Sequence, residues 1–345
     1  MDDPKNNKGI GCAFNRTVKR IGRIIPTAVN VVYNGFAIAK SLVFASLKNR
    51  SLEATSFTPN GDTVFYRCKR LDIETIRQEV IESRPRIRGP IDIIVDGHDE
   101  MFYGDHTIEG VVGTKPRDGT CWAFKFLVVK VLGGPVLDVL PMKDGSTIKS
   151  TIKALEELRR RYEIRRVYMD GEFYAIDILH YLTEHGIHYA VRGKIPPSLW
   201  KDHIPYETPL EHFLQRRNPD GSILHVVFCL YKYKSEIDNS DYCIVTDRPC
   251  DPKELRINYT RRWDIESGIR DLNQLEIKTT TRNPVLRFLF YAVAAIIYNF
   301  WVVVRKDIGI RLYGLRELLL SIVGFVQTVQ MVICGRKIRL KLHPS

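Results

Sequence analysis

The stretch Ile91-Asp-Ile-Ile-Val-Asp96 decides the fold, because it has the length and the β-branched residues of a buried strand and ends in an acid. The pattern returns in Arg166-Val-Tyr-Met-Asp170, and a third acid, Glu266, falls in a helical stretch. An Asp that follows a strand is often only a cap for the next turn. Two such acids on neighbouring strands can instead converge. With a third, they can hold two Mg²⁺ ions about 3.5–4 Å apart, the arrangement used for attack on a phosphodiester.

The periodicity around these two runs predicts one mixed sheet. Gly133-Gly134, between two apolar runs, is a hairpin signal. Three antiparallel strands, a helix, a parallel strand, a helix and a fifth strand are expected to follow one another. The strands are expected at 91–96, 121–132, 135–141, 164–170 and 187–192, and the helices from Ser146 or Thr147 to about Arg161 and from Tyr174 to His185.

The whole chain is expected to contain several modules, because 345 residues exceed one ordinary small domain. Residues 1–84 are predicted to form a helical module, with a flexible basic arm over the first 20 or so residues. Residues 85–193 and 254–305 are predicted to be two parts of one catalytic domain. A β-rich insertion at 194–253 separates them, and residues 306–345 form a basic, helical extension.

A short helix is predicted after Asp62, which is a candidate N-cap. This helix carries Arg67, Lys69 and Arg70. It is either the recognition helix of a helix-turn-helix or a basic surface helix of a bundle, and the pattern alone favours neither.

Three stretches resemble the DDE transposases of prokaryotic insertion sequences, namely residues 91–104, Val167–Tyr174 and Tyr259–Glu266. The resemblance extends over about residues 50 to 305. It implies an α/β fold with a ribonuclease-H-like mixed sheet, and it tips the interpretation of the N-terminal helices toward DNA binding. It also implies that Asp96, Asp170 and Glu266 are catalytic and bind two Mg²⁺ or Mn²⁺ ions. A homodimer that bridges two element ends on double-stranded DNA is the implied assembly.

The last of these stretches matches the family's Y-R-E-K signature. In that signature the tyrosine and the arginine, here Tyr259 and Arg262, contact the transferred end, and the glutamate, here Glu266, binds metal. Spacings of three and four residues place the three side chains on one helix face. Periodicity alone favours an ordinary amphipathic helix whose polar face meets water.

The chain departs from the signature at its lysine, which falls at Asn273. This departure puts in doubt the phosphate contact that the lysine supplies in the family. Arg270 and Lys278 are the candidate replacements.

A basic loop and two aromatic residues complete the candidate site. The loop Gly113-Thr-Lys-Pro-Arg-Asp-Gly119 offers Lys115 and Arg117 to phosphate. It is too irregular for a P-loop, so no nucleotide cofactor is expected. His98 either orients a water or a nucleotide or is an ordinary hydrogen-bonded loop histidine, the commoner case. Trp263 either stacks on an extruded base or packs in the core, and core packing is favoured.

Composition limits the possible partners. The formal charge of +12 and the pI near 9.3 favour a polyanionic partner. Seven cysteines without a Cys-x-x-Cys pair, behind a polar N-terminus, favour reduced thiols in the cytoplasm. The apolar run at 288–304 is long enough to be considered as a membrane span. It suits a buried core helix equally well, and nothing else favours lipid, so no membrane association is expected.

The function that follows is a DNA transposase that cuts element ends and transfers the 3′-OH to a target. A transposase-derived DNA-binding protein that lacks catalysis and a structure-selective nuclease of the same fold are the alternatives.

Overall fold

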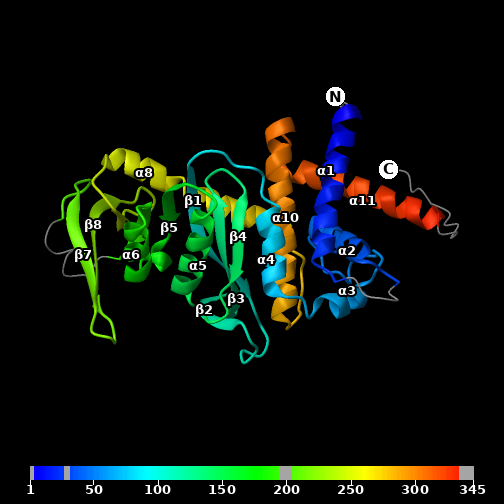
Figure 1. Cartoon of the computed structure of the whole chain (residues 1–345), viewed down its shortest axis with the longest axis horizontal. Helices are drawn as coiled ribbons and strands as arrows, with labels where there is room; N and C mark the ends of the chain where they lie inside the picture. The colour runs from blue at the N-terminus through cyan, green and yellow to red at the C-terminus, as the bar shows by residue number, and fades with distance from the viewer. Residues whose placement is uncertain (1–3, 27–31, 195–203, 334–345) are drawn as a thin grey trace. The chain divides into compact units, whose positions relative to one another are not determined.

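The computed structural model describes residues 4–26, 32–194 and 204–333, and it divides into two compact units (Figure 1). One unit is Met1–Pro85 with Asp271–Ser345, and the other is Arg86–Arg270. The first division lies next to the predicted boundary at 84/85. Residues 271–305 group with the N-terminal helices, whereas we expected them in the α/β domain.

The second unit is built on one mixed sheet, of nine strands within the described residues. β3 is antiparallel to β1 and β4, whereas β5 runs parallel to β1 and to β6. This order and these directions confirm the predicted ribonuclease-H-like sheet. The strands are β1 (Ile91–Met101), β2 (Val111–Arg117), β3 (Thr120–Val131), β4 (Val136–Pro141), β5 (Ile164–Met169) and β6 (His188–Gly193).

The segment predicted as a β-rich insertion extends this same sheet. It contains β7 (Leu210–Arg217), β8 (Ile223–Lys234) and β9 (Asp241–Thr246). β9 pairs antiparallel with β6, so the sheet continues through β9 and β8 to β7. The β character was predicted, but the shared sheet was not.

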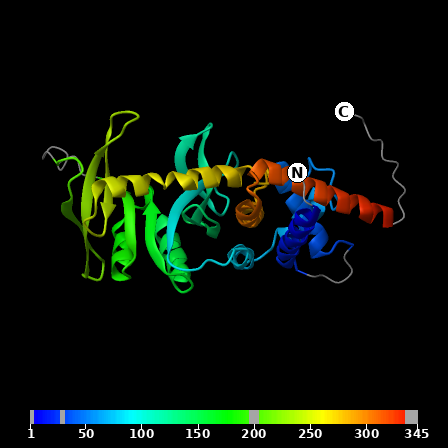
Figure 2. The same cartoon turned by 90° about the horizontal axis from the view of Figure 1, so that it is seen from above.

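Helices cover both faces of the sheet. α5 (Thr147–Arg159) and α6 (Ile176–Glu184) lie on one face, and α8 (Pro252–Thr260) and α9 (Trp263–Asn273) on the other. Figure 2 shows the yellow α8 and α9 along one face and the green α5 and α6 opposite. α5 starts where predicted, because Ser146 caps it by accepting the backbone N–H of Lys149.

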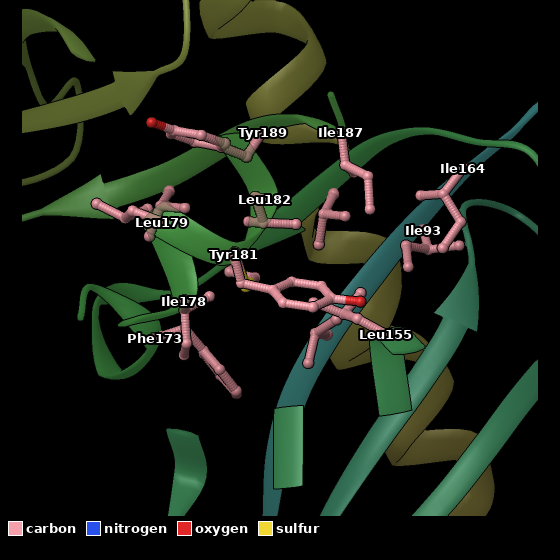
Figure 3. Packing of buried hydrophobic residues seen from close by; sticks show 14 of the residues in the cluster. Ile93, Leu155, Ile164, Phe173, Ile178, Leu179, Tyr181, Leu182, Ile187 and Tyr189 are labelled. Atoms are coloured by element: carbon pink, nitrogen blue, oxygen red, sulfur yellow. The ribbon is translucent and has the colours of Figure 1, made fainter. Parts of the chain in front are cut away.

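The two faces are sorted by alternation along the strands. Ile91, Ile93 and Val95 of β1 join the apolar cluster under α5 and α6, part of which Figure 3 shows. Ile94 of β1 and Tyr168 of β5 join the cluster under α8 and α9. Since successive side chains of a strand point to opposite faces, positions 96 and 170 share the face of Ile94 and Tyr168.

The first unit is helical. Its central helix, α10, packs against α1, α2, α3 and α4, and α11 packs against α2 and α1. The helices are α1 (Pro4–Arg23), α2 (Gly35–Lys48), α3 (Gly61–Cys68), α4 (Ile73–Glu82), α10 (Pro284–Ile308) and α11 (Leu312–Ile333).

The predicted flexible basic arm is wrong. Residues 4–23 form α1, in which Ile10, Phe14, Val18 and Ile21 are buried. Their spacing of three and four residues makes an apolar stripe on one side of the helix. The ring of Phe14 lies 5.5 Å from that of Phe300 in α10.

The apolar run at 288–304 forms the middle of α10. The segment Pro284–Asp307 is apolar and long enough to cross a membrane, and 94% of its most apolar window is buried inside the protein. Such burial is what a core helix requires, and Asn299 within it donates a hydrogen bond to Ser83 Oγ at 2.9 Å.

Candidate active site

Asp96 and Asp170 lie level with each other on adjacent strands. β1 and β5 are parallel, and Val95 of β1 pairs with Met169, the last residue of β5. The next residue on each strand is therefore an acid, and both side chains share the α8–α9 face.

One detail of the prediction is wrong, because Asp96 does not end its strand. β1 continues to Met101 as a partner of β3, with Asp96 opposite Val128. The parallel partner β5 stops here, so the strand loses a neighbour on one side only. The apolar run ends at residue 95, where β1 loses β5 as its partner, and the strand itself continues.

Each aspartate also makes the local turn contact that an ordinary capping residue makes. Asp96 Oδ1 accepts the N–H of Gly97 at 2.8 Å, and Asp170 Oδ1 accepts the N–H of Gly171 at 2.6 Å. Asp170 is the N-cap of a short 3-10 helix, Gly171–Phe173. These contacts fix the direction of the side chains, and the chemistry of the site depends on what else faces them.

Glu266 comes from α9. Ile265 and Ile269 on this helix pack on the sheet, as their spacing predicted. Arg262 Nη2 donates to Glu266 Oε1 at 3.4 Å, one helical turn apart. The Glu266 side chain keeps 46% of its surface exposed, so its carboxylate remains open to a ligand.

The three acids act on one another electrostatically. Burial raises the pKa of Asp96 to about 6, against the charge of Arg262 and the Gly97 N–H, which lower it, while Asp170 and Glu266 raise it further. Within the described residues, no three His, Cys, Asp or Glu side chains stand close enough to enclose an ion in this arrangement. The negative charges of Asp170 and Glu266 repel that of Asp96, and a bound cation would weaken this repulsion.

Arg262 and Tyr259 lie beside the three acids. Tyr259 is buried and donates its hydroxyl to the backbone oxygen of Met169 at 3.2 Å, next to Asp170. The Arg262 guanidinium lies 5.6 Å from the Tyr259 ring and is only 7% exposed. Its Nε is buried and has no hydrogen-bond partner among the described residues. A buried guanidinium with an unused donor beside three acids suits an anion that arrives with the substrate.

A groove of about 750 Å³ opens beside Asp170. Lys115 and Arg117 line it, so the structure brings these two predicted residues to the site. They lie on β2, not on the loop that we predicted, and the following turn at Asp118-Gly119 leads into β3. The groove therefore has cations fixed on a strand at its edge.

Three other cations of this groove were missed from the sequence, namely Lys125, Arg192 and Lys194. Lys125 Nζ lies 3.1 Å from Glu172 Oε1 and 3.6 Å from Asp99 Oδ1. A single lysine inside the apolar run of β3 was the available signal, because a lysine between phenylalanines in a strand needs a polar partner.

Some predicted residues lie elsewhere. Arg67 donates to the backbone oxygens of Pro26 at 2.6 Å and of Tyr33 at 3.4 Å, so its guanidinium is already engaged within the first unit. Its helix α3 is capped by Asn60, which accepts from Thr63, and not by Asp62 as we predicted. Lys69 lies 5.2 Å from the ring of Tyr66, and Arg70 is exposed.

The end of α9 also departs from the signature. Asn273 lies in the first unit, where its backbone oxygen accepts from Asn49 at 2.6 Å. Arg270 is exposed and donates to Ser267 at 3.4 Å. Lys278 pairs with Glu276 at 3.2 Å. None of these contacts identifies the replacement for the missing lysine.

The two aromatic residues beside the site differ from what we favoured. His98 lies on β1, not in a loop, and is buried with its ring 6.4 Å from Phe126. Trp263 is 53% exposed, so core packing is wrong. The guanidinium of Arg262 lies 5.9 Å from its ring.

Comparison with known proteins decides the family. The family model described as the transposase DDE domain matches residues 110–300, more than half of the chain. The chain belongs to the DDE transposase family. No curated protein matches this transposase. Its fold is similar to that of the piggyBac transposase in a synaptic complex with hairpin DNA, with a TM-score of 0.64 and 10% identity. That match covers 97% of this transposase and 83% of the solved chain.

Proposed function

We propose that this DNA transposase cuts the ends of a mobile element and joins the freed 3′-OH to target DNA, with Asp96, Asp170 and Glu266 as its catalytic acids. The observation that supports this most strongly is the register of β1 and β5, which makes Asp96 and Asp170 level neighbours on the face where α9 presents Glu266. An ordinary pair of capping residues would need neither the third acid nor the buried arginine.

The donor set fits hard divalent ions. Three carboxylates supply only oxygen ligands, which Mg²⁺ and Mn²⁺ prefer. Burial and, to a smaller extent, the neighbouring Asp170 and Glu266 raise the pKa of Asp96, and a bound cation would favour its charged form. Two bound ions would supply an activated water and stabilise the leaving 3′ oxygen.

The residues of the chain then have separate tasks. Arg262, with its unused Nε, binds a non-bridging oxygen of the phosphate that reacts. Tyr259 holds Arg262 and the end of β5 in place. Lys115, Arg117 and the other groove cations hold the neighbouring backbone phosphates.

The reaction proceeds in two displacements at phosphorus. In the first, the oxygen of a water bonds to phosphorus and the element's 3′ oxygen leaves, taking a proton. In the second, that 3′-OH bonds to a target phosphorus, loses its proton, and displaces a target 3′ oxygen. The number of phosphodiester bonds is conserved in the second step, so it needs no external energy source or nucleotide cofactor.

The partner is double-stranded DNA, at both the element ends and the target, and two copies of the chain bring two ends together. The solved relative is itself in a synaptic complex with hairpin DNA. We assign recognition of the ends to the helical residues 1–84, with Lys69 and Arg70 as its candidate contacts. Arg67 is the weaker candidate, because its guanidinium already holds two backbone oxygens.

The test is a cleavage and joining assay on DNA that carries the inverted repeats flanking the coding region, with Mg²⁺, with Mn²⁺ and with EDTA. Wild type is compared with Asp96→Asn, Asp170→Asn and Glu266→Gln. Glu109→Gln is the matched control, because Glu109 is 73% exposed and pairs with Lys143, away from the three acids in the sequence and outside the groove lining. Loss of both products in the three variants and not in the control supports the proposal.

The same assay separates the alternatives. Cut ends that never join identify a nuclease, and DNA binding without any cut identifies a non-catalytic protein. Wild-type turnover in any one of the three variants removes that residue from the catalytic set.

A further inference from the structure

The acids lie at one end of the parallel strands of the second unit, the end that these strands reach last in the chain. β1, β5 and β6 begin near Ile91, Ile164 and His188 and reach the acids at their other ends. Asp96 lies five residues beyond Ile91. At about 3.3 Å per residue, the two edges of the sheet are about 17 Å apart.

The edge where these strands begin is rich in arginine. A hollow of about 610 Å³ lies there, lined among others by Pro90, Arg159, Arg160, Arg165 and His188. Arg161 follows in the chain, and Arg86 and Arg88 come shortly before Pro90. We call these six arginines the basic edge: Arg86, Arg88, Arg159, Arg160, Arg161 and Arg165.

Most of the basic edge is not neutralised by the protein. Arg165 is used, because it bonds to Asp92 through its Nε and Nη2 at 2.8 and 2.5 Å. The other five are exposed, and none of them has an ion pair among the described residues. The neighbouring His188 is held by Asp247 at 2.7 Å, so that acid does not serve them either.

Helix ends explain only part of this charge. α5 ends at Arg159, and one cation near a helix C-terminus offsets about half an elementary charge. Glu163, which is exposed at the same hollow, offsets one more. Five free guanidinium groups exceed what these two features need. The positive charge of Arg159 and Arg160 also reaches Tyr181, whose pKa is raised by burial and by Glu156 and is lowered by these two cations.

We propose that the basic edge is a second DNA-binding surface, which holds the phosphate backbone of duplex DNA away from the acids. All six cations are arginines, whose planar fork binds phosphate in two-point fashion. A span of about 17 Å equals about five base pairs of duplex. Contacts of these arginines with backbone phosphates carry no sequence information, so binding is expected to a duplex of any sequence. This inference rests on the proposed function, since it takes DNA as the substrate.

The test measures DNA binding in EDTA, by fluorescence anisotropy with a 30-base-pair duplex of arbitrary sequence at several salt concentrations. The test variant is Arg159→Gln/Arg160→Gln/Arg161→Gln. The matched control is Lys149→Gln/Arg217→Gln/Lys234→Gln, three exposed cations of the same unit outside the basic edge. A third variant replaces the three arginines by lysines, which keeps the charge and removes the fork.

The expected result is a Kd at least about ten-fold higher for the glutamine variant, with the slope of log Kd against log salt lower by about 2 to 3. The control should stay within about two-fold of wild type. The lysine variant should keep most of the salt slope, which shows that charge and not misfolding is responsible. An unchanged Kd and slope in the glutamine variant would overturn the inference.

Failure of the proposed function gives a different pattern. Because binding is measured without metal, its result does not depend on whether the acids cut DNA. If no cleavage is ever seen but the arginine variant still binds weakly, the DNA-binding surface stands and the catalytic proposal falls. A Tm equal to that of wild type in the arginine variant confirms that the sheet is intact.

Discussion

The two edges of the same parallel strands carry opposite chemistry. At one edge, β1 and β5 deliver Asp96 and Asp170 to a partly buried group of acids that contains a buried arginine. At the other, the segments before β1 and β5 carry exposed arginines without acidic partners. The comparison teaches that burial separates the two proposed roles. Asp96, to which we assign chemistry, is held largely out of water, whereas the arginines that we propose hold a polyanion stay in water.

The largest expected effect is at the acidic edge. Replacing Asp96, Asp170 or Glu266 by its amide should lower the cleavage rate by about 1,000-fold or more, because each loss removes a ligand from the cation site. DNA affinity without metal should change little. Single-turnover cleavage kinetics on a labelled element end measures this, and a rate within ten-fold of wild type would contradict the assignment.

The next largest effect concerns Arg262. Arg262→Lys should lower the rate by about 100-fold, because a lysine cannot replace the fork that faces both Glu266 and the phosphate. A second variant, Arg262→Gln, also removes the positive charge, which lowers the pKa of Asp96. The acidic limb of the pH–rate profile of Arg262→Gln should therefore move to higher pH. A profile that keeps its wild-type midpoint would mean that Arg262 does not face Asp96 in the active complex.

A smaller effect is expected when the basic edge is changed in an active enzyme. The glutamine triple variant at residues 159–161 should raise the KM for DNA by about ten-fold and leave kcat within about two-fold of wild type, because these side chains lie at the end of the parallel strands opposite to the acids. Steady-state cleavage at increasing DNA concentration separates the two constants. A fall in kcat without a change in KM would mean that these arginines act in the chemical step, as part of the same functional site as the acids.

The smallest effect is on stability. Asp96 has a pKa of about 6 in the fold and an ordinary value of 3.8 otherwise, so its charged form destabilises the native state. That cost is fully present above pH 6 and disappears as the pH falls toward 4. In EDTA, Asp96→Asn should be more stable than wild type by about 1–3 kcal/mol at pH 8 and equal to it at pH 4. Thermal unfolding at both pH values checks this. An Asp96→Asn variant that is less stable than wild type at pH 8 would show that burial does not disfavour the charged form of Asp96.

The strand order of the α/β domain could be predicted because the signals are local. The run before Asp96, the Gly133-Gly134 hairpin and the Ser146 cap each depend on a few neighbouring residues. The extension of the sheet by β7 to β9 could not be predicted in this way. It depends on β9 meeting β6, and no local pattern records which strands pair across the chain.

Two errors had visible causes. β2 was taken for a loop because Gly113, Pro116 and Gly119 are turn residues, but the strand has an irregular register there that tolerates them. The N-terminal helix was taken for an arm because its cations drew attention away from Ile10, Phe14 and Val18, which have helical spacing. The cations show only that the surface of this segment is basic, whereas the spacing of its apolar residues shows that it forms a helix with one buried side.

The candidate acids were visible in the sequence, but their shared environment was not. The face on which positions 96 and 170 point follows from alternation, once the strand register is known. Lys125, Arg192 and Lys194 were missed because each becomes part of the groove only through the pairing of strands that are distant in the chain.

The continuation of β1 past Asp96 places two of the proposed catalytic acids on the sheet and leaves the third on a helix. Asp96 is held in a ladder with β3, whereas Glu266 is carried by α9, which packs on the sheet through Ile265 and Ile269 and is tied to β3 by the ion pair of Asp264 with Lys130. A substitution that replaces none of the three acids can therefore change their relative positions. Reshaping the underside of α9 would reposition one acid against a fixed pair.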